Sequence, residues 1–70
     1  MAEIICPMAG KIMEVNMEVG KPVQEDDEII IIEAMKMENP IFCVASGVVK
    51  EIKCKPGDKV NEGDVLAIIE

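Results

Sequence analysis

Apolar and polar residues alternate along the chain in short stretches that turn residues separate. Ile12 to Val15 shows this alternation, and the aliphatic run from Ile29 to Ile32 is typical of a buried strand. Residues suited to fixed or positive φ, as in Gly20-Lys21-Pro22 and Pro56-Gly57-Asp58, mark the turns. The pattern predicts strands over residues 3–6, 11–16, 22–24, 28–34, 37–44, 48–54, 59–61 and 65–69. Because Pro40 falls inside one of them, that strand is expected to be irregular or to lie at a sheet edge.

The sequence contains an internal repeat, because residues 4–33 align with residues 41–70 without a gap when the chain is shifted by 37 positions. Eleven of the thirty aligned pairs are identical: Ile4/Ile41, Cys6/Cys43, Gly10/Gly47, Glu14/Glu51, Gly20/Gly57, Val23/Val60, Glu25/Glu62, Asp27/Asp64, Ile31/Ile68, Ile32/Ile69 and Glu33/Glu70. Stacked repeat arrays need about three or more copies, so two copies are expected to close on each other. The predicted fold is all-β, a flattened barrel or sandwich of two four-stranded antiparallel sheets with a pseudo-twofold internal repeat (a barrel-sandwich hybrid). Residues 1–70 are expected to form this single domain.

Composition agrees with a thin β-sandwich and limits the chemistry of the chain. Phe42 is the only aromatic residue, so the core must be built from aliphatic side chains of similar size. There is no His, Thr or Tyr and Ser46 carries the only side-chain hydroxyl, which leaves no Ser/His or Cys/His pair for nucleophilic catalysis. Cys6, Cys43 and Cys54 lack Cys-x-x-Cys spacing and are predicted to be reduced thiols. We expect no catalytic residue, no metal site and no autonomous enzyme.

The chain carries a formal net charge of −7, and its seven basic residues are all lysines. Nucleic-acid binding needs clustered positive charge and is not expected, whereas a basic partner surface would fit. The acidic run Glu25-Asp26-Asp27-Glu28 is expected to be a solvated loop, because four successive carboxylates cannot converge on one ion. The first residues lack a signal segment, and the run Ile29 to Ile32 is too short to span a bilayer. The cytoplasm is therefore the expected compartment.

The two repeats are joined by residues 34–40, a segment that has no counterpart elsewhere in the chain. Only Met35 and Lys36 separate the strands predicted on either side, which leaves room for a two-residue hairpin turn. Such turns favour Asn-Gly or Asp-Gly because both central residues need positive φ. Met-Lys is a poor local choice, so these residues are expected to serve something other than turn stability. At a hairpin tip the Lys36 amine would project into water, where an external enzyme could acylate it.

Residues 33–39, Glu-Ala-Met-Lys-Met-Glu-Asn, resemble the attachment motif of the biotinyl domains of biotin-dependent carboxylases, decarboxylases and transcarboxylases, which belong to the biotin/lipoyl attachment family. The resemblance extends over nearly the whole chain. Residues 7–11 are similar to the opening segment of that family, although Ala9 stands where a second proline is common. Residues 46–52 and 56–64 resemble its closing half.

The resemblance implies a covalent biotin cofactor on Lys36, attached by a biotin protein ligase that uses an ATP-derived biotinyl adenylate. The domain would then carry carboxybiotin between a biotin carboxylase site and a carboxyltransferase or decarboxylase site. The ligase, the biotin carboxylase and the carboxyltransferase are thus the implied partners. Glu33, Ala34, Met35 and Met37 complete the implied attachment site around Lys36.

Two segments qualify the resemblance. Residues 42–45 depart from the usual family pattern, which concerns packing more than function. Residues 16–22 are too few for the protruding thumb that some biotin carriers have there, so the chain resembles the thumbless type. For Met35 and Met37 two interpretations stay open: their pliable side chains fill the hairpin end, or the ligase recognises them.

A lipoyl domain is the nearest alternative, because lipoyl domains share the duplicated barrel and the lysine at the hairpin tip. Their attachment point resembles Asp-Lys-Ala, so Met35 and Met37 favour biotin here. A stand-alone attachment protein that accepts either group also stays open. An unmodified adaptor, whose acidic surface binds a partner and in which Lys36 is incidental, is an alternative of a different class.

Overall fold

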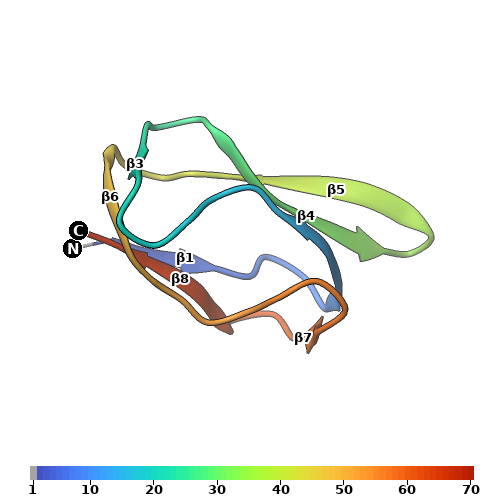
Figure 1. Cartoon of the computed structure of the whole chain (residues 1–70). Helices are drawn as coiled ribbons and strands as arrows, with labels where there is room; N and C mark the ends of the chain where they lie inside the picture. The colour runs from blue at the N-terminus through green and yellow to red at the C-terminus, as the bar shows by residue number, and fades with distance from the viewer. Residues whose placement is uncertain (1) are drawn as a thin grey trace.

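The structure, a computed structural model, describes residues 2–70 and consists of eight strands joined by turns and loops (Figure 1). The strands are β1 Ala2–Ile5, β2 Gly10–Val15, β3 Pro22–Val23, β4 Glu28–Ala34, β5 Met37–Phe42, β6 Gly47–Ile52, β7 Lys59–Val60 and β8 Val65–Ile69. Every predicted strand is present, with bounds that differ by at most two residues. Met1, the first residue of the predicted domain, lies outside the described residues.

The strands form two antiparallel four-stranded sheets, in the orders β1-β8-β6-β3 and β5-β4-β2-β7. Each strand of one sheet corresponds to the strand four places along the chain in the other, so the sequence repeat is also a structural repeat. The predicted all-β fold of two four-stranded sheets is confirmed. Pro40 lies in β5, which is an edge strand as predicted. At an edge, the missing N–H of proline interrupts only one ladder.

The core lies between the sheets and is built from small aliphatic side chains and thiols. Its fully buried members include Ile4, Ile12, Ile29, Ile30, Ile32, Val49, Leu66 and Ile69. The repeat-related Cys6 and Cys43 are also buried, and each thiol donates a hydrogen bond to the carbonyl oxygen two residues later, at 2.8 and 3.0 Å. Cys54 is buried as well, and all three cysteines are free thiols, in agreement with the prediction.

The molecule is elongated, with extents of 31 × 17 × 17 Å, and its two ends differ. Figure 1 shows the N- and C-termini together at one end and the β4–β5 hairpin extending at the other. The fold therefore holds the segment that joins the two repeats far from both chain ends. Within residues 2–70 no helix is present that could cross a membrane.

Candidate functional site at the β4–β5 hairpin

The β4–β5 hairpin ends in a two-residue turn formed by Met35 and Lys36. Ala34 of β4 and Met37 of β5 are the last paired residues, so nothing else lies between the strands. The φ angles of Met35 and Lys36 are 54° and 64°, which places both in the left-handed region. Two successive positive φ values define the turn as type I′, the type that matches the twist of adjacent antiparallel strands. The predicted hairpin and its position are confirmed.

The turn holds non-glycine residues in a conformation that favours glycine. Left-handed backbone costs roughly 1–2 kcal/mol for each residue that carries a Cβ. The other positive φ angles in residues 2–70 belong to Gly20, Gly57, Gly63 and Asp26, and aspartate tolerates this region better than methionine or lysine. Backbone strain is therefore concentrated at the hairpin tip, as the composition of the turn predicts.

The side chains of the tip project into solvent. Met35 is 92% exposed and Met37 is 65% exposed, and Lys36 between them is exposed as well. Ala34, which is buried, anchors the end of β4 to the body of the protein. The two methionines do not fill the hairpin end, so that interpretation is wrong. Two exposed methionines beside an exposed lysine instead form an apolar surface around an amine.

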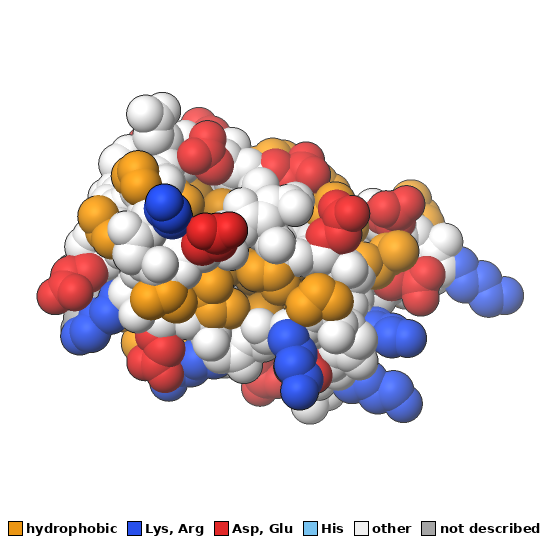
Figure 2. Space-filling model, viewed as in Figure 1, with side chains coloured by type: hydrophobic (Ala, Val, Ile, Leu, Met, Phe, Trp, Pro, Cys, Tyr) orange, Lys and Arg blue, Asp and Glu red, His pale blue; other side chains and the backbone are white. Residues whose placement is uncertain are grey.

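Charged residues on the four strands of this sheet form a row below the tip. The strand register places Glu33 opposite Glu38, Lys11 opposite Glu33, and Lys59 opposite Lys11. All four side chains are exposed. The row thus runs from two carboxylates on β5 and β4 to two ammonium groups on β2 and β7. Figure 2 shows basic side chains gathered at the end of the molecule where Figure 1 draws the hairpin.

A groove of about 430 Å³ lies between the hairpin and this basic part of the row. It is lined by Glu33, Ala34 and Met35 from β4 and the turn, by Ala9, Gly10 and Lys11 at the start of β2, and by Lys59, Val60 and Asn61 at β7. The sequence alone does not predict this groove. Its two lysines are far apart in the chain, and only the pairing of β2 with β7 brings them together. The internal repeat does mark these two positions as unusual, because Lys11 aligns with Val48 and Lys59 aligns with Pro22.

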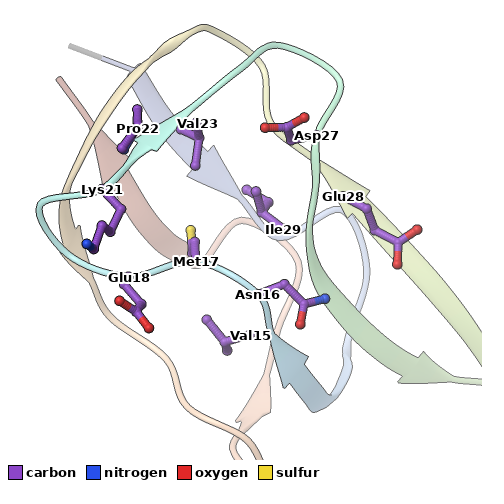
Figure 3. Close-up of a pocket in the computed structure, with 10 residues that line it drawn as sticks. All are labelled: Val15, Asn16, Met17, Glu18, Lys21, Pro22, Val23, Asp27, Glu28 and Ile29. Carbon is purple, nitrogen blue, oxygen red and sulfur yellow. The ribbon is translucent and has the colours of Figure 1, made fainter.

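A second cavity, of about 480 Å³, lies at the opposite end of β2 and β4 (Figure 3). Figure 3 shows Glu18 and Lys21 on one side of it and Asp27 and Glu28 on the other. Since Ile29 lines this cavity and Ala34 ends the same strand at the hairpin, the cavity is remote from Lys36. It is a mainly acidic surface depression, and Lys21 is the one basic side chain among its lining residues.

The acidic run of residues 25–28 is exposed, as the sequence predicts. The side chain of Asp27 accepts a hydrogen bond from the Gln24 backbone N–H at 2.9 Å and so shapes the turn before β4. In the described part of the chain, no three His, Cys, Asp or Glu side chains are grouped so that they could hold a metal ion. The chemistry available at the hairpin is therefore that of one primary amine. A cofactor attached by an amide bond needs an exposed amine, and Lys36 fits this requirement.

Comparison with known proteins agrees with this geometry. The family model described as "Biotin-requiring enzyme" matches residues 2–69. The chain is 56% identical over 36 residues to the propionyl-CoA carboxylase alpha chain of Ruegeria pomeroyi, a match that covers 51% of this chain and 5% of that protein. It is 51% identical over 35 residues to the biotin carboxyl carrier protein of Streptococcus mutans, covering 50% and 27%. The matched segments thus make up about a quarter or less of these two relatives.

Solved structures show the same fold. The urea carboxylase of Kluyveromyces lactis is similar over 99% of this chain and 6% of that protein, with a TM-score of 0.91 and 36% identity. The lipoyl domain of the 2-oxoglutarate dehydrogenase complex from Azotobacter vinelandii is similar over 100% of this chain and 96% of that domain, with a TM-score of 0.83 and 26% identity. Because the family model matches residues 2–69 and the fold agrees throughout, the chain belongs to the biotin/lipoyl attachment family, the family of the biotin-requiring enzymes.

Proposed function

We propose that the chain is a biotin carboxyl carrier domain in which Lys36 is the site of biotin attachment. The observation that carries this proposal is the strained type I′ turn, which holds Lys36 exposed between two exposed methionines. A turn kept for stability would contain Asn-Gly, so the residues present indicate another use. The family membership supports biotin as the group attached.

In this proposal Lys36 supplies the nucleophile and a biotin protein ligase supplies the activation. The Lys36 ammonium group first loses a proton, and the neutral Nζ attacks the activated carboxyl carbon of biotinyl adenylate. The bond from that carbon to the phosphate oxygen breaks, AMP leaves, and the nitrogen loses a second proton as the uncharged amide forms. Met35 and Met37, with Glu33 beside them, form the surface that the ligase recognises, while the buried Ala34 anchors the turn. Bound biotin supplies a ring nitrogen that accepts and releases a carboxyl group.

The domain itself performs no catalysis in this proposal and acts by tethering. Residues 1–70 form one domain that presents the cofactor first to a biotin carboxylase site and then to a carboxyltransferase or decarboxylase site. A tether replaces a free encounter with an effective concentration that is in the mM range for short flexible connections. Because the amine lies at the end of an elongated barrel, the cofactor can enter a partner's site while the barrel stays outside.

The proposal places the domain in the cytoplasm, in a reducing environment. The three cysteines are free and buried, which agrees with a compartment where disulfides are rare. The acidic character of the chain, with a net charge of −7, favours partners that present basic surfaces.

Intact-mass analysis after incubation with biotin, ATP and a biotin protein ligase tests the proposal. The expected result is the addition of one biotinyl group, which peptide sequencing maps to Lys36. The Lys36→Arg variant should gain nothing, whereas Lys21→Arg, at the other end of the barrel, should be modified like the parent chain. Absence of modification, or modification of another lysine, would contradict the proposal.

A lipoyl carrier is the second candidate, because the likeness to a lipoyl domain covers nearly all of both chains. The same mass analysis with lipoate, ATP and a lipoate ligase distinguishes the two. Lipoylation without biotinylation would replace the first proposal, and modification by both ligases would identify a dual attachment protein. An adaptor that needs no cofactor would keep its partner after Lys36→Ala.

A further inference from the structure

We infer that the groove beside the hairpin is a resting site for the ring of biotin attached to Lys36. We call this groove the lysine groove, and its lining consists of Ala9, Gly10, Lys11, Glu33, Ala34, Met35, Lys59, Val60 and Asn61. The ring would lie against Ala34 and Val60, and the ammonium groups of Lys11 and Lys59 would donate hydrogen bonds to its ureido oxygen. This inference rests on the proposed function and adds a site to it.

The position of the lysine groove suits a tethered occupant. Ala34 and Met35 line it, and Lys36 is the next residue along the chain, so an arm on Lys36 starts at its rim. The opposite wall comes from β2 and β7, where Gly10 pairs with Val60. An arm made of the lysine side chain and the acyl chain of biotin can fold back over this short separation without any movement of the backbone.

The chemistry of the lysine groove complements that of biotin. The bicyclic ring has an apolar thioether part and a ureido carbonyl oxygen that accepts hydrogen bonds. Lysine ammonium groups are donors only, and hydrogen bonds from a charged donor are stronger than neutral ones. The groove volume of about 430 Å³ is within the range of roughly 300–1,000 Å³ that is usual for small-molecule sites. The carboxyl group that the cofactor carries is an anion, so the two lysines would favour the loaded cofactor as well.

The structural repeat shows that the fold does not require lysines at this place. The pairing of Lys11 with Lys59 on β2 and β7 corresponds to the pairing of Val48 with Pro22 on β6 and β3. Two ammonium groups directly opposite each other destabilise a sheet, whereas valine and proline do not repel. The less favourable pair occurs at the end of the barrel that carries Lys36. Glu33, which pairs with Lys11 and also lines the groove, can balance one of the two charges. The second ammonium group leaves the groove with a net positive charge, which favours a ligand that accepts hydrogen bonds or is an anion.

Protection of a sheet edge explains only part of this pattern. Edge lysines commonly prevent strands of different molecules from pairing, and β7, with Lys59, is an edge strand. Lys11, however, lies on β2, which pairs with strands on both sides. A lysine on an inner strand does not protect an edge.

Comparison of backbone amide NMR spectra of the unmodified and the biotinylated chain tests the inference. A resting ring should shift the amide resonances of Gly10, Val60 and Asn61 in addition to those of the hairpin. Nuclear Overhauser contacts should connect the ring protons with the methyl groups of Ala34 and Val60. Shifts confined to the hairpin tip, with no contact between the ring and Val60, would overturn the inference.

Matched variants distinguish the shifts that depend on Lys11 and Lys59 from the shifts that biotinylation causes by itself. The double variant Lys11→Ala/Lys59→Ala should lose the shifts at Val60 and Asn61 while Lys36 is still biotinylated. Replacing both lysines with arginine should keep the shifts, because a positive donor remains. Replacing Lys21 with alanine, at the cavity at the opposite end of β2 and β4, should leave the shifts unchanged. Persistence of the shifts in the Lys11/Lys59 alanine variant, with circular dichroism confirming an intact fold, would also overturn the inference.

A second measurement keeps this test independent of the ligase. The unmodified chain is titrated with biotin methylamide, an untethered analogue of the biotinylated side chain. Resonances of Val60 and Asn61 should shift with increasing concentration, and the Lys11→Ala/Lys59→Ala variant should show no such shift. If Lys36 is never biotinylated but these resonances move, the proposed function fails and the site stands. If Lys36 is biotinylated and neither measurement shows the site, the inference fails alone.

Discussion

The two halves of the chain have the same backbone fold, but the side chains at their corresponding strand ends differ. The Ile12 N–H donates to the carbonyl oxygen of Asp58 at 2.8 Å. At the corresponding place in the other half, the Val49 N–H donates to the carbonyl oxygen of Lys21 at 3.0 Å. At the adjacent strand pairs, Lys11 and Lys59 at the hairpin end correspond to Val48 and Pro22 near the chain termini. The backbone pairing therefore tolerates both sets of side chains. The surface beside the hairpin thus carries a pair of lysines that the corresponding surface of the other half lacks.

The core allows the largest test of how far the two halves are equivalent. Ile32 and Ile69 are repeat partners and both are buried, so replacing either with alanine should destabilise the protein by about 2–5 kcal/mol. The two losses should be similar, because β4 and β8 both pair with strands on either side. Urea unfolding of both variants measures the difference. A loss at one site that is much larger than at the other would show that the two halves do not contribute equally to stability.

The repeat-related glycines provide a smaller test. A Cβ at Gly10 would contact the backbone carbonyl oxygen of Glu33, and a Cβ at Gly47 would meet that of Glu70 in the same way. Such crowding typically costs about 1–3 kcal/mol, so alanine at either site should lower the free energy of unfolding. Gly10→Ala should be the worse change, because Glu33 is held between β2 and β5. Thermal unfolding of the two variants, compared with each other, checks this order.

Relief of the strain at the hairpin should increase stability and at the same time remove the proposed attachment site. Replacing Met35 with Asn and Lys36 with Gly gives the residues that a type I′ turn favours, and should stabilise the fold by about 1–2 kcal/mol. Asp26→Gly, which introduces the residue that the other half has at Gly63, should stabilise it less, because aspartate tolerates positive φ. Chemical denaturation measures both. A destabilised hairpin variant would contradict the view that Met35 and Lys36 are kept at a structural cost.

The smallest expected effect concerns Cys54, whose repeat partner is Met17. Burial raises the pKa of the Cys54 thiol, and the nearby Asp58 and Cys6 raise it further. Because the folded protein then binds the thiol proton more tightly than the unfolded chain, stability should decrease as pH rises through the ordinary thiol value of 9.0. The Cys54→Met variant should show a smaller decrease. Urea unfolding of both proteins from neutral to alkaline pH isolates the contribution of the thiol, and identical slopes would contradict it.

Much of the fold could be predicted from the sequence because its signals are local or repeated. Period-two alternation and turn residues placed the strands, and the shift of 37 positions revealed the duplication. The hairpin at Met35 and Lys36 followed from the unusual residues between two predicted strands. The exposure of the two methionines could not be predicted, because an apolar side chain at a turn can pack inward or project outward and only the surrounding surface decides.

The sequence by itself determined the strands, the duplicated plan and the position of the candidate lysine. Backbone preferences and side-chain alternation act over a few residues, so they can be read along the chain. Only the tertiary structure decided which strands became neighbours, and hence that Lys11 and Lys59 stand opposite each other beside the hairpin. The lateral pairing of β2 with β7 results from closure of the whole barrel and not from either segment alone. A site assembled by that closure has no local signature, whereas the strained turn that displays Lys36 does.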